Sequence, residues 1–222
     1  MMISPDTFYE MKLKGKSKEE IMTVIRGLKR KITRLKNVME HPDYKNRKMA
    51  MQPCESVQIA MNREYLKQAK RALKEVGCIY ESSKSEIKLE IFNDNIPYIS
   101  KITFNIGGCF GGKTIKTFIF DDEKIYTNTL NMPHCDIADF DKYEELQMDK
   151  NDFLEKLKDL HIGEWRREYN LRRFDCFVMD GTQWSLSVAF SNGCRRVKIH
   201  GSNDYPYNFD GLLDLFGIEE KI

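Results

Sequence analysis

Apolar positions early in the chain recur with the spacing of α-helices. From Ser17 to about Met39 they fall at alternating intervals of four and three residues, on one narrow side of a helix. This seam consists of Ile21, Ile25, Leu28, Ile32, Leu35 and Met39. Ser17 and Glu20 have the spacing of a capping box, in which each side chain pairs with a backbone N–H of the other residue. The pattern predicts a helix that packs on one partner helix.

A second helical pattern runs from about Glu55 to Val76, beyond a segment that contains Pro42 and Pro53. Gly77 follows it, where a helix C-cap is expected. Its apolar side carries Ile59, Leu66, Ala69, Leu73 and Val76. Two helices of similar length with a loop between them form an antiparallel hairpin. We therefore expect a basic helical hairpin as a first domain over residues 1–80.

Beyond ESSKSE, which we interpret as a polar linker, the hydrophobic period changes to two, as in β-strands. A helical pattern returns at about Asp149–Leu160 and in NFDGLLDLFG, which Asn208 and Gly217 would begin and end. Strands are expected in YISKITFNI, in IKTFIFDD with KIYTNTL as its extension, and in RFDCFVM, TQWSLSVAFS and CRRVKIHG. These elements predict an α+β fold. Its second domain, residues 81–222, is an antiparallel sheet (β-β-α-β-β-β-α) with helices on one face.

Two dipeptides mark tight turns between the last strands. Asp180-Gly181 and Asn192-Gly193 both suit turns that require positive φ. A turn at Asn192-Gly193 places Val188 opposite Val197 and Leu186 opposite Ile199. Both pairs then lie on one face, so the register agrees with the hydrophobic pattern.

The segment GGCFGGKT, residues 107–114, fits the phosphate-loop pattern G-x-x-x-x-G-K-[ST]. A phosphate loop requires a helix after the glycines, because the N–H groups at the helix start converge on phosphate. The residues that follow, TIKTFIFDDE, have the period of a strand instead. We therefore expect a hairpin loop here and keep nucleotide binding only as a remote alternative.

Charge is distributed unevenly along the chain. Residues 1–77 contain 18 Lys and Arg against 9 Asp and Glu, whereas the remainder contains 18 against 25. The basic part either binds an anionic partner or is neutralised by the acidic part. On the first predicted helix the candidate nucleic-acid contacts are Arg26, Lys29, Arg30, Arg34 and Lys36. The competing explanation is local: acids begin this helix and bases fill its later turns, which suits the helix dipole.

Patterns for other chemistry are weak. The six cysteines are widely spaced and form no C-x-x-C, so we expect reduced thiols and no metal site. No histidine has a neighbouring Ser or Cys in a context for nucleophilic catalysis, and we expect no catalytic residue and no cofactor. One polar, aromatic loop is a candidate ligand or interaction site, although such loops also brace helix starts. Its candidate residues are Ser202, Asn203, Tyr205 and Tyr207.

Several segments carry specific motifs, among them IPYISKITFNIGGCFGG, LHIGEWRREYN and DGTQWSLSVAFSNGCRRVKIHGSNDYPYNFDGLLDLFGIEE, with DGTQW and GSNxYPxNF. Together they resemble a family of hypothetical proteins from anaerobic, often gut-dwelling, bacteria and their mobile elements. The resemblance extends over most of the chain, and it implies no activity, cofactor or catalytic residue.

The sequence therefore predicts a non-catalytic binding or regulatory module that acts through protein–protein interaction. The alternative is nucleic-acid binding through the basic helix face, and an exposed part of the helix seam would also suit a homodimer. Without an apolar segment of signal-peptide or transmembrane type, we expect a cytoplasmic protein and no membrane partner.

Overall fold

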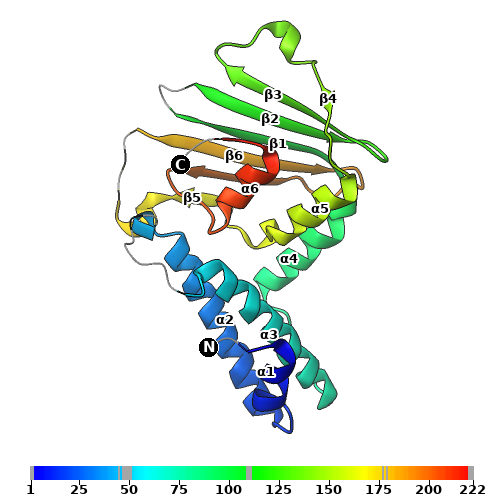
Figure 1. Cartoon of the computed structure of the whole chain (residues 1–222), viewed down its shortest axis with the longest axis vertical. Helices are drawn as coiled ribbons and strands as arrows, with labels where there is room; N and C mark the ends of the chain where they lie inside the picture. The colour runs from blue at the N-terminus through cyan, green and yellow to red at the C-terminus, as the bar shows by residue number, and fades with distance from the viewer. Residues whose placement is uncertain are drawn as a thin grey trace. The chain divides into compact units, whose positions relative to one another are not determined.

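The computed structural model describes residues 3–44, 46, 52–108, 112–176, 178 and 180–219. The chain divides into two units, Met1–Ser82 and Ser83–Ile222, of which the first is helical and the second is built on a β-sheet (Figure 1). This boundary lies two residues after the predicted one, which follows residue 80. None of the described helices is long and apolar enough to cross a membrane.

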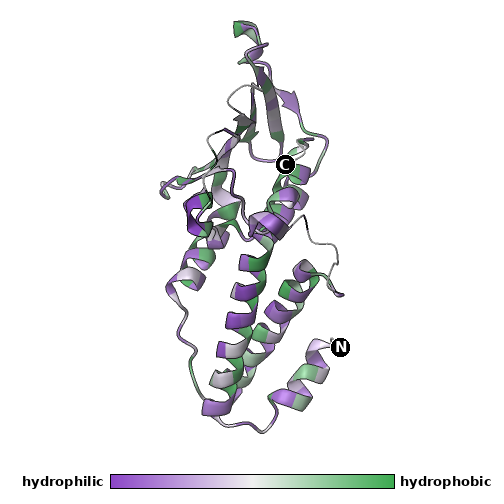
Figure 2. Cartoon of the chain, turned by 90° about the vertical axis from the view of Figure 1, so that its left-hand side faces the viewer, coloured by the Kyte–Doolittle hydropathy of each residue, from purple (hydrophilic) through white to green (hydrophobic). Residues whose placement is uncertain are grey.

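The described residues of the N-terminal unit form α1 (Pro5–Lys12), α2 (Lys18–Met39), the short 3₁₀ helix η1 (Pro42–Tyr44) and α3 (Glu55–Glu75). The hairpin of α2 and α3 is confirmed, and so is the capping box of Ser17 with Glu20. Hydrophobic and hydrophilic residues lie on different sides of these helices (Figure 2). The core combines Leu13, Ile21, Ile25 and Leu28 with Tyr65, Ala69, Ala72 and Leu73 of α3.

α1 was not predicted from the sequence, although the chain carries a start signal for this helix. Ser4 is the N-cap, its Oγ accepts a hydrogen bond from the Thr7 N–H at 3.1 Å, and Pro5 occupies the first turn. Phe8 of α1 stacks on Tyr65 of α3, with ring centroids 4.2 Å apart. This tertiary contact stabilises a helix that is too short to be stable alone.

In the C-terminal unit the strands form one sheet in the order β4-β3-β2-β1-β6-β7-β5. All neighbouring strands are antiparallel except β5 and β7, which are parallel. The strands are β1 (Ile99–Gly108), β2 (Lys113–Phe120), β3 (Ile125–Met132), β4 (Glu144–Glu145), β5 (Glu168–Asn170), β6 (Thr182–Phe190) and β7 (Val197–Ser202).

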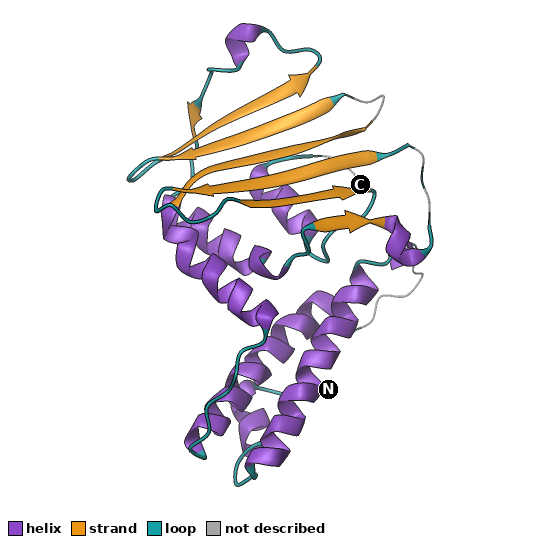
Figure 3. Cartoon of the chain, turned by 180° about the vertical axis from the view of Figure 1, so that it is seen from behind, coloured by secondary structure: helices purple, strands orange, loops and turns teal. Residues whose placement is uncertain are grey.

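Helices cover one face of this sheet: α4 (Lys84–Asn95), α5 (Lys150–Asp159) and α6 (Phe209–Phe216) (Figure 3). The core between the layers is rich in aromatic rings, and Phe118 of β2 lies 5.1 Å from Phe153 of α5 and 4.8 Å from Phe216 of α6, centroid to centroid. The predicted helices at 149–160 and 209–216 are confirmed. Gly217 ends α6 in the left-handed conformation, with φ of 64°.

The predicted register of the last hairpin is confirmed, because Val188 pairs with Val197 and Leu186 with Ile199. KIYTNTL belongs to β3, which pairs with β2 as a separate strand rather than extending it. The predicted strand RFDCFVM is wrong over its described residues, because Arg173 and Phe174 belong to the 3₁₀ helix η5 (Leu171–Phe174) and Asp175, Cys176 and Val178 belong to no strand. Phe177 and Met179, also in that prediction, lie outside the described residues.

The segment we interpret as a linker contains the start of α4 instead. Ser83 caps this helix, and Glu86 completes the capping box, so the S-x-x-E signal was present in ESSKSE. Among the residues of α4 only Phe92 is buried. The sequence of α4 therefore has no apolar stripe with the period of a helix, and the helix could not be predicted from such a pattern.

The residues after GGCFGGKT are extended, as the sequence predicts. β2 pairs antiparallel with β1, and Gly107 lies opposite Lys113. Cys109, Phe110 and Gly111 lie outside the described residues. Because Lys113 and Thr114 already belong to a strand, no helix start follows the glycines, and the phosphate-loop geometry is missing.

Candidate ligand-binding groove

A groove of about 730 Å³ lies within the C-terminal unit, between α4 and the beginning of β7. One wall is α4, and the 3₁₀ helix η4 (Ile162–Glu164) packs directly against it. A Cβ atom at Gly163 would lie 2.7 Å from Leu89 Cα and 2.9 Å from Phe92 Cβ. Glycine is therefore needed for this close approach, which fixes the position of α4 beside the groove.

The opposite wall is β7 together with the loop that enters it. β5 pairs with β7 only at His200, Gly201 and Ser202. The preceding part of β7, Val197–Ile199, pairs with β6 on one side, and in the described chain no strand lies beside it on the other side, where β5 would continue. Phe190, Cys194, Arg195 and Arg196 complete this wall.

The floor of the groove is apolar. Phe92, Ile162 and Ile199 are buried residues of the sheet–helix core. Phe190 packs edge-to-face on Phe92, with centroids 6.2 Å apart. A ligand that covered this floor would remove apolar surface from water, which stabilises a complex by about 25 cal/mol per Å² buried before the costs of association.

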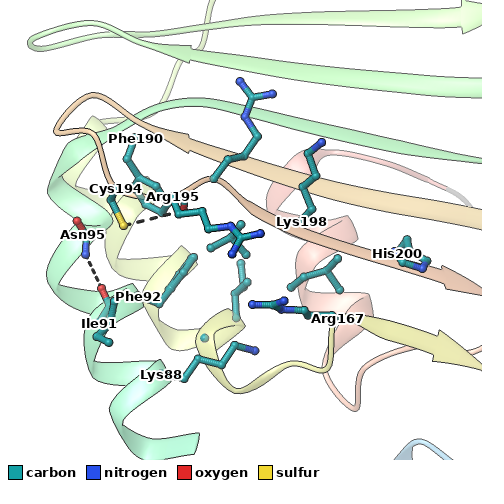
Figure 4. A pocket seen from close by; sticks show the side chains of 15 residues that line it. Lys88, Ile91, Phe92, Asn95, Arg167, Phe190, Cys194, Arg195, Lys198 and His200 are labelled. Carbon is teal, nitrogen blue, oxygen red and sulfur yellow. Dashed lines mark hydrogen bonds between the residues drawn. The ribbon is translucent and has the colours of Figure 1, made fainter. Parts of the chain in front are cut away.

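The rim is strongly basic, and among the described residues no Asp or Glu lines the groove. Its charged residues come from four segments: Lys88, Arg167, Arg195, Arg196 and Lys198. Lys88, Arg167 and Arg195 extend toward the groove from different elements (Figure 4). This concentration is local, since residues 83–222 contain 18 Lys and Arg against 24 Asp and Glu.

The cations influence one another. Lys88 Nζ donates a hydrogen bond to the main-chain oxygen of Trp165 at 2.6 Å. Partial desolvation of the ammonium group lowers the pKa of Lys88, and the nearby positive charge of Arg167 lowers it further. An anion bound between these two side chains would favour the charged form of Lys88 and so oppose both effects on its pKa.

The groove has few groups suited to catalysis. Cys194 Sγ has its hydrogen bond with the carbonyl of Arg195, at 3.9 Å, rather than with a base. Within the described ranges no three His, Cys, Asp or Glu side chains gather as a metal site would require. The arrangement of an apolar floor and a cationic rim is typical of a site that binds an anion with an apolar part.

The predicted basic residues lie elsewhere, on α2 of the N-terminal unit. Arg26, Arg30 and Arg34 are exposed, and none of them forms a hydrogen bond or ion pair with a described residue. Lys29 is engaged with Tyr80, whose hydroxyl accepts a hydrogen bond from its Nζ at 3.0 Å. Lys36 is partly buried and also has an interaction partner. Of the predicted nucleic-acid contacts, the three arginines are therefore accessible to a ligand, whereas the two lysines are engaged within the chain.

The candidate loop at 202–207 braces the fold. Asn203 Oδ1 accepts a hydrogen bond from the Thr182 N–H at 2.8 Å, and Ser202 Oγ accepts one from Gln183 at 2.7 Å. Tyr205 packs on Phe209 of α6, with centroids 4.9 Å apart. Tyr207 is partly buried. These contacts support the structural role that the sequence analysis gives as the alternative for this loop.

The most constrained residue of this loop is Asp204, which the sequence analysis did not single out. It is 2% exposed and pairs with Arg173 at 2.8 Å, and its carbonyl accepts a hydrogen bond from Trp184 Nε1 at 2.9 Å. Burial raises the pKa of Asp204, while the charge and hydrogen bond of Arg173 act in the opposite direction.

The groove was not predicted from the sequence, because its cations are spread over α4, the residue before β5, the β6–β7 loop and β7 itself. Two signals were present: the pairs Arg166-Arg167 and Arg195-Arg196 interrupt an acidic half of the chain. Neither pair predicts a site without the fold that brings them together.

Fold and groove together define an α+β protein with a cationic, apolar-floored groove in its sheet unit. No protein-family model, curated protein or solved structure matches the chain. The resemblance to the family of hypothetical proteins therefore stays a prediction.

Proposed function

We propose that this chain is a non-catalytic binding module that holds an acidic segment of a partner protein in the groove. The observation that carries the proposal is the rim, whose described residues include five Lys and Arg side chains and no acid, in a unit with an excess of acids. Such a local field attracts anions and accelerates their encounter with the groove. The apolar floor adds affinity for a ligand with hydrophobic side chains.

The test is charge reversal with a matched control. Arg195→Glu with Lys198→Glu reverses two rim charges, while Lys113→Glu with Lys156→Glu makes the same change at exposed positions outside the groove. Fluorescence anisotropy with labelled peptides that combine Glu or Asp with Val or Ile measures binding. We expect the rim variant to lose at least about tenfold in affinity and the control less than about twofold. Equal losses in both variants, or no binding by the wild type, would contradict the proposal.

A second candidate function is nucleic-acid binding through α2. The exposed, unpaired Arg26, Arg30 and Arg34 support it, because like charges one turn apart repel unless an anion neutralises them. Filter binding of duplex and single-stranded DNA at several salt concentrations tests it. Affinity that falls steeply with salt, and that the triple change to Glu abolishes, would favour this function. Affinity that survives the triple change would reject it.

A further inference from the structure

The open edge of β7 presents main-chain hydrogen-bonding groups to the groove. His200 N donates to the carbonyl of Arg167 at 3.1 Å, so the main-chain polar groups of His200 face the side on which β5 lies. Backbone groups repeat their direction every second residue along a strand. Those of Lys198 therefore face the same side, where the described chain has no strand.

β5 shows what this edge accepts. It lies beside β7 in parallel, with Glu168 opposite His200 and Tyr169 opposite Gly201. Tyr169 is buried on the helix-covered face, whereas Glu168 is exposed on the other face beside His200. Next to the groove, the segment paired with this edge of β7 therefore has an acidic residue, Glu168, on one face and a buried aromatic residue, Tyr169, on the other.

The same alternation continues in β7 itself. Ile199 is buried and Val197 is partly buried on the helix-covered face, opposite Leu186 and Val188. Lys198, between them, is exposed on the other face. A strand laid along this part of β7 would place every second side chain over the apolar floor and the intervening ones next to the cations.

We infer that the groove binds its acidic segment as an added β-strand, paired with β7 through Lys198 and continuing the line of β5. The inference rests on the proposed function and adds the conformation and sequence pattern of the partner. The segment is extended, about five residues long, and alternates Glu or Asp with apolar β-branched residues. Its acids face Lys198 and the neighbouring rim arginines, and its apolar side chains cover Phe92 and Ile162.

The competing explanation is that the cations only protect an exposed edge from pairing, as lysines commonly do on edge strands. The two explanations differ in what an acidic strand does at this site. Cations that only protect the edge keep cationic or neutral strands from pairing with it. The affinity of an acidic peptide then does not depend on which of its backbone N–H groups are free. An accepting edge requires both the alternating order and the backbone N–H groups on one side of the peptide.

Four synthetic peptides of one composition distinguish these explanations on the full chain. The first alternates Glu with Val, and the second has the same residues with all acids first. The third and fourth keep the alternating order but are N-methylated, one at the Glu residues and the other at the Val residues. In an added strand only one of these two sets of N–H groups faces β7, so N-methylation of that set removes donors and blocks close approach.

Fluorescence anisotropy measures affinity, and hydrogen exchange followed by NMR measures protection of the Lys198 amide. We expect the blocked order and one N-methylated peptide to bind at least about tenfold more weakly than the alternating peptide, and the other methylated peptide to bind within about threefold of it. Exchange at Lys198 should slow on binding of the alternating peptide, while Val197 and Ile199, whose N–H groups point toward β6, should change little.

If all four peptides bind equally and Lys198 stays unprotected, the added strand is wrong, although an acidic ligand in the groove would stand. If none of the peptides binds, the proposed function fails as well. If binding is equal in the wild type and in the variant with Arg195→Glu and Lys198→Glu, the peptides bind elsewhere and both proposals fail.

Discussion

Replacing Gly163 with alanine should destabilise the C-terminal unit and disturb the groove together. The new methyl group would lie 2.7 Å from Leu89 Cα and 2.9 Å from Phe92 Cβ, well inside van der Waals contact. Neither neighbour can rotate away, because Leu89 Cα is backbone and Phe92 is 4% exposed in the core. Relief requires α4 and η4 to separate. Overpacking of this kind costs about 1–3 kcal/mol, which lowers Tm by about 3–10 °C in a protein of this size.

Tryptophan fluorescence reports this unit selectively, since Trp165 and Trp184 are the only two tryptophans of the chain. Thermal and urea unfolding of the full chain, monitored by tryptophan fluorescence, measures how much stability the C-terminal unit loses in Gly163→Ala. The matched control is Gly27→Ala, because Gly27 lies within α2 and has no atom within 4 Å of an added Cβ. Alanine should there stabilise the helical unit by about 1 kcal/mol. Unchanged tryptophan unfolding and unchanged peptide binding in Gly163→Ala would refute the packing of η4 on α4 as we describe it.

Three further predictions test other parts of the structure. Burial raises the folded pKa of Asp204, so the stability that this residue contributes is complete below its unfolded pKa and is lost as pH rises through its folded pKa. Urea unfolding at several pH values should therefore show the free energy of unfolding of Asp204→Asn rising relative to the wild type over that window. A fall would mean that the effect of Arg173 on the pKa of Asp204 outweighs burial. Asn203→Ala should lower the free energy of unfolding by about 1–2 kcal/mol in the same assay, since it removes the hydrogen bond to the Thr182 N–H and places alanine at φ of 52°. Unchanged stability together with lost ligand binding would instead identify the loop as a binding site. Arg30→Glu should stabilise α2 by about 0.5–1 kcal/mol, because it replaces two repulsive contacts with attractive ones to Arg26 and Arg34. Helix unfolding followed by circular dichroism checks this, and destabilisation would mean that Arg30 makes a favourable interaction within the chain that outweighs the repulsion.

Elements with a regular apolar period were predictable from sequence. The seam of α2, the register of β6 with β7 and the end of α6 at Gly217 each follow from local spacing and turn chemistry. Elements held mainly by tertiary contacts were not. α4 buries only Phe92 and so lacks a stripe, and β5 is a strand because its three residues pair with β7. Their local start signals, Ser83 with Glu86 for example, are too common to be decisive without a period.

The candidate sites show the same division. The stripe of Arg26, Arg30 and Arg34 could be placed on one helix face from its spacing alone. The groove could not, because Lys88 and Lys198 are brought together only when α4 packs beside the sheet. The mixture of Ser202, Asn203 and Tyr205 suggested a ligand loop, yet the hydrogen bonds and ring contacts of these residues are internal. The polar residues around the buried Asp204 stabilise the fold. From composition alone, such a loop looks the same as one that binds a ligand.

The most direct test of an acidic ligand in the groove is a ¹⁵N-labelled NMR titration of the full chain with the alternating Glu–Val peptide. We predict saturable shifts centred on Lys88, Arg167, Arg195 and Lys198, with the resonances of Arg26 and Arg30 on α2 unmoved. Shifts confined to α2, or no shifts at millimolar peptide, would contradict the account.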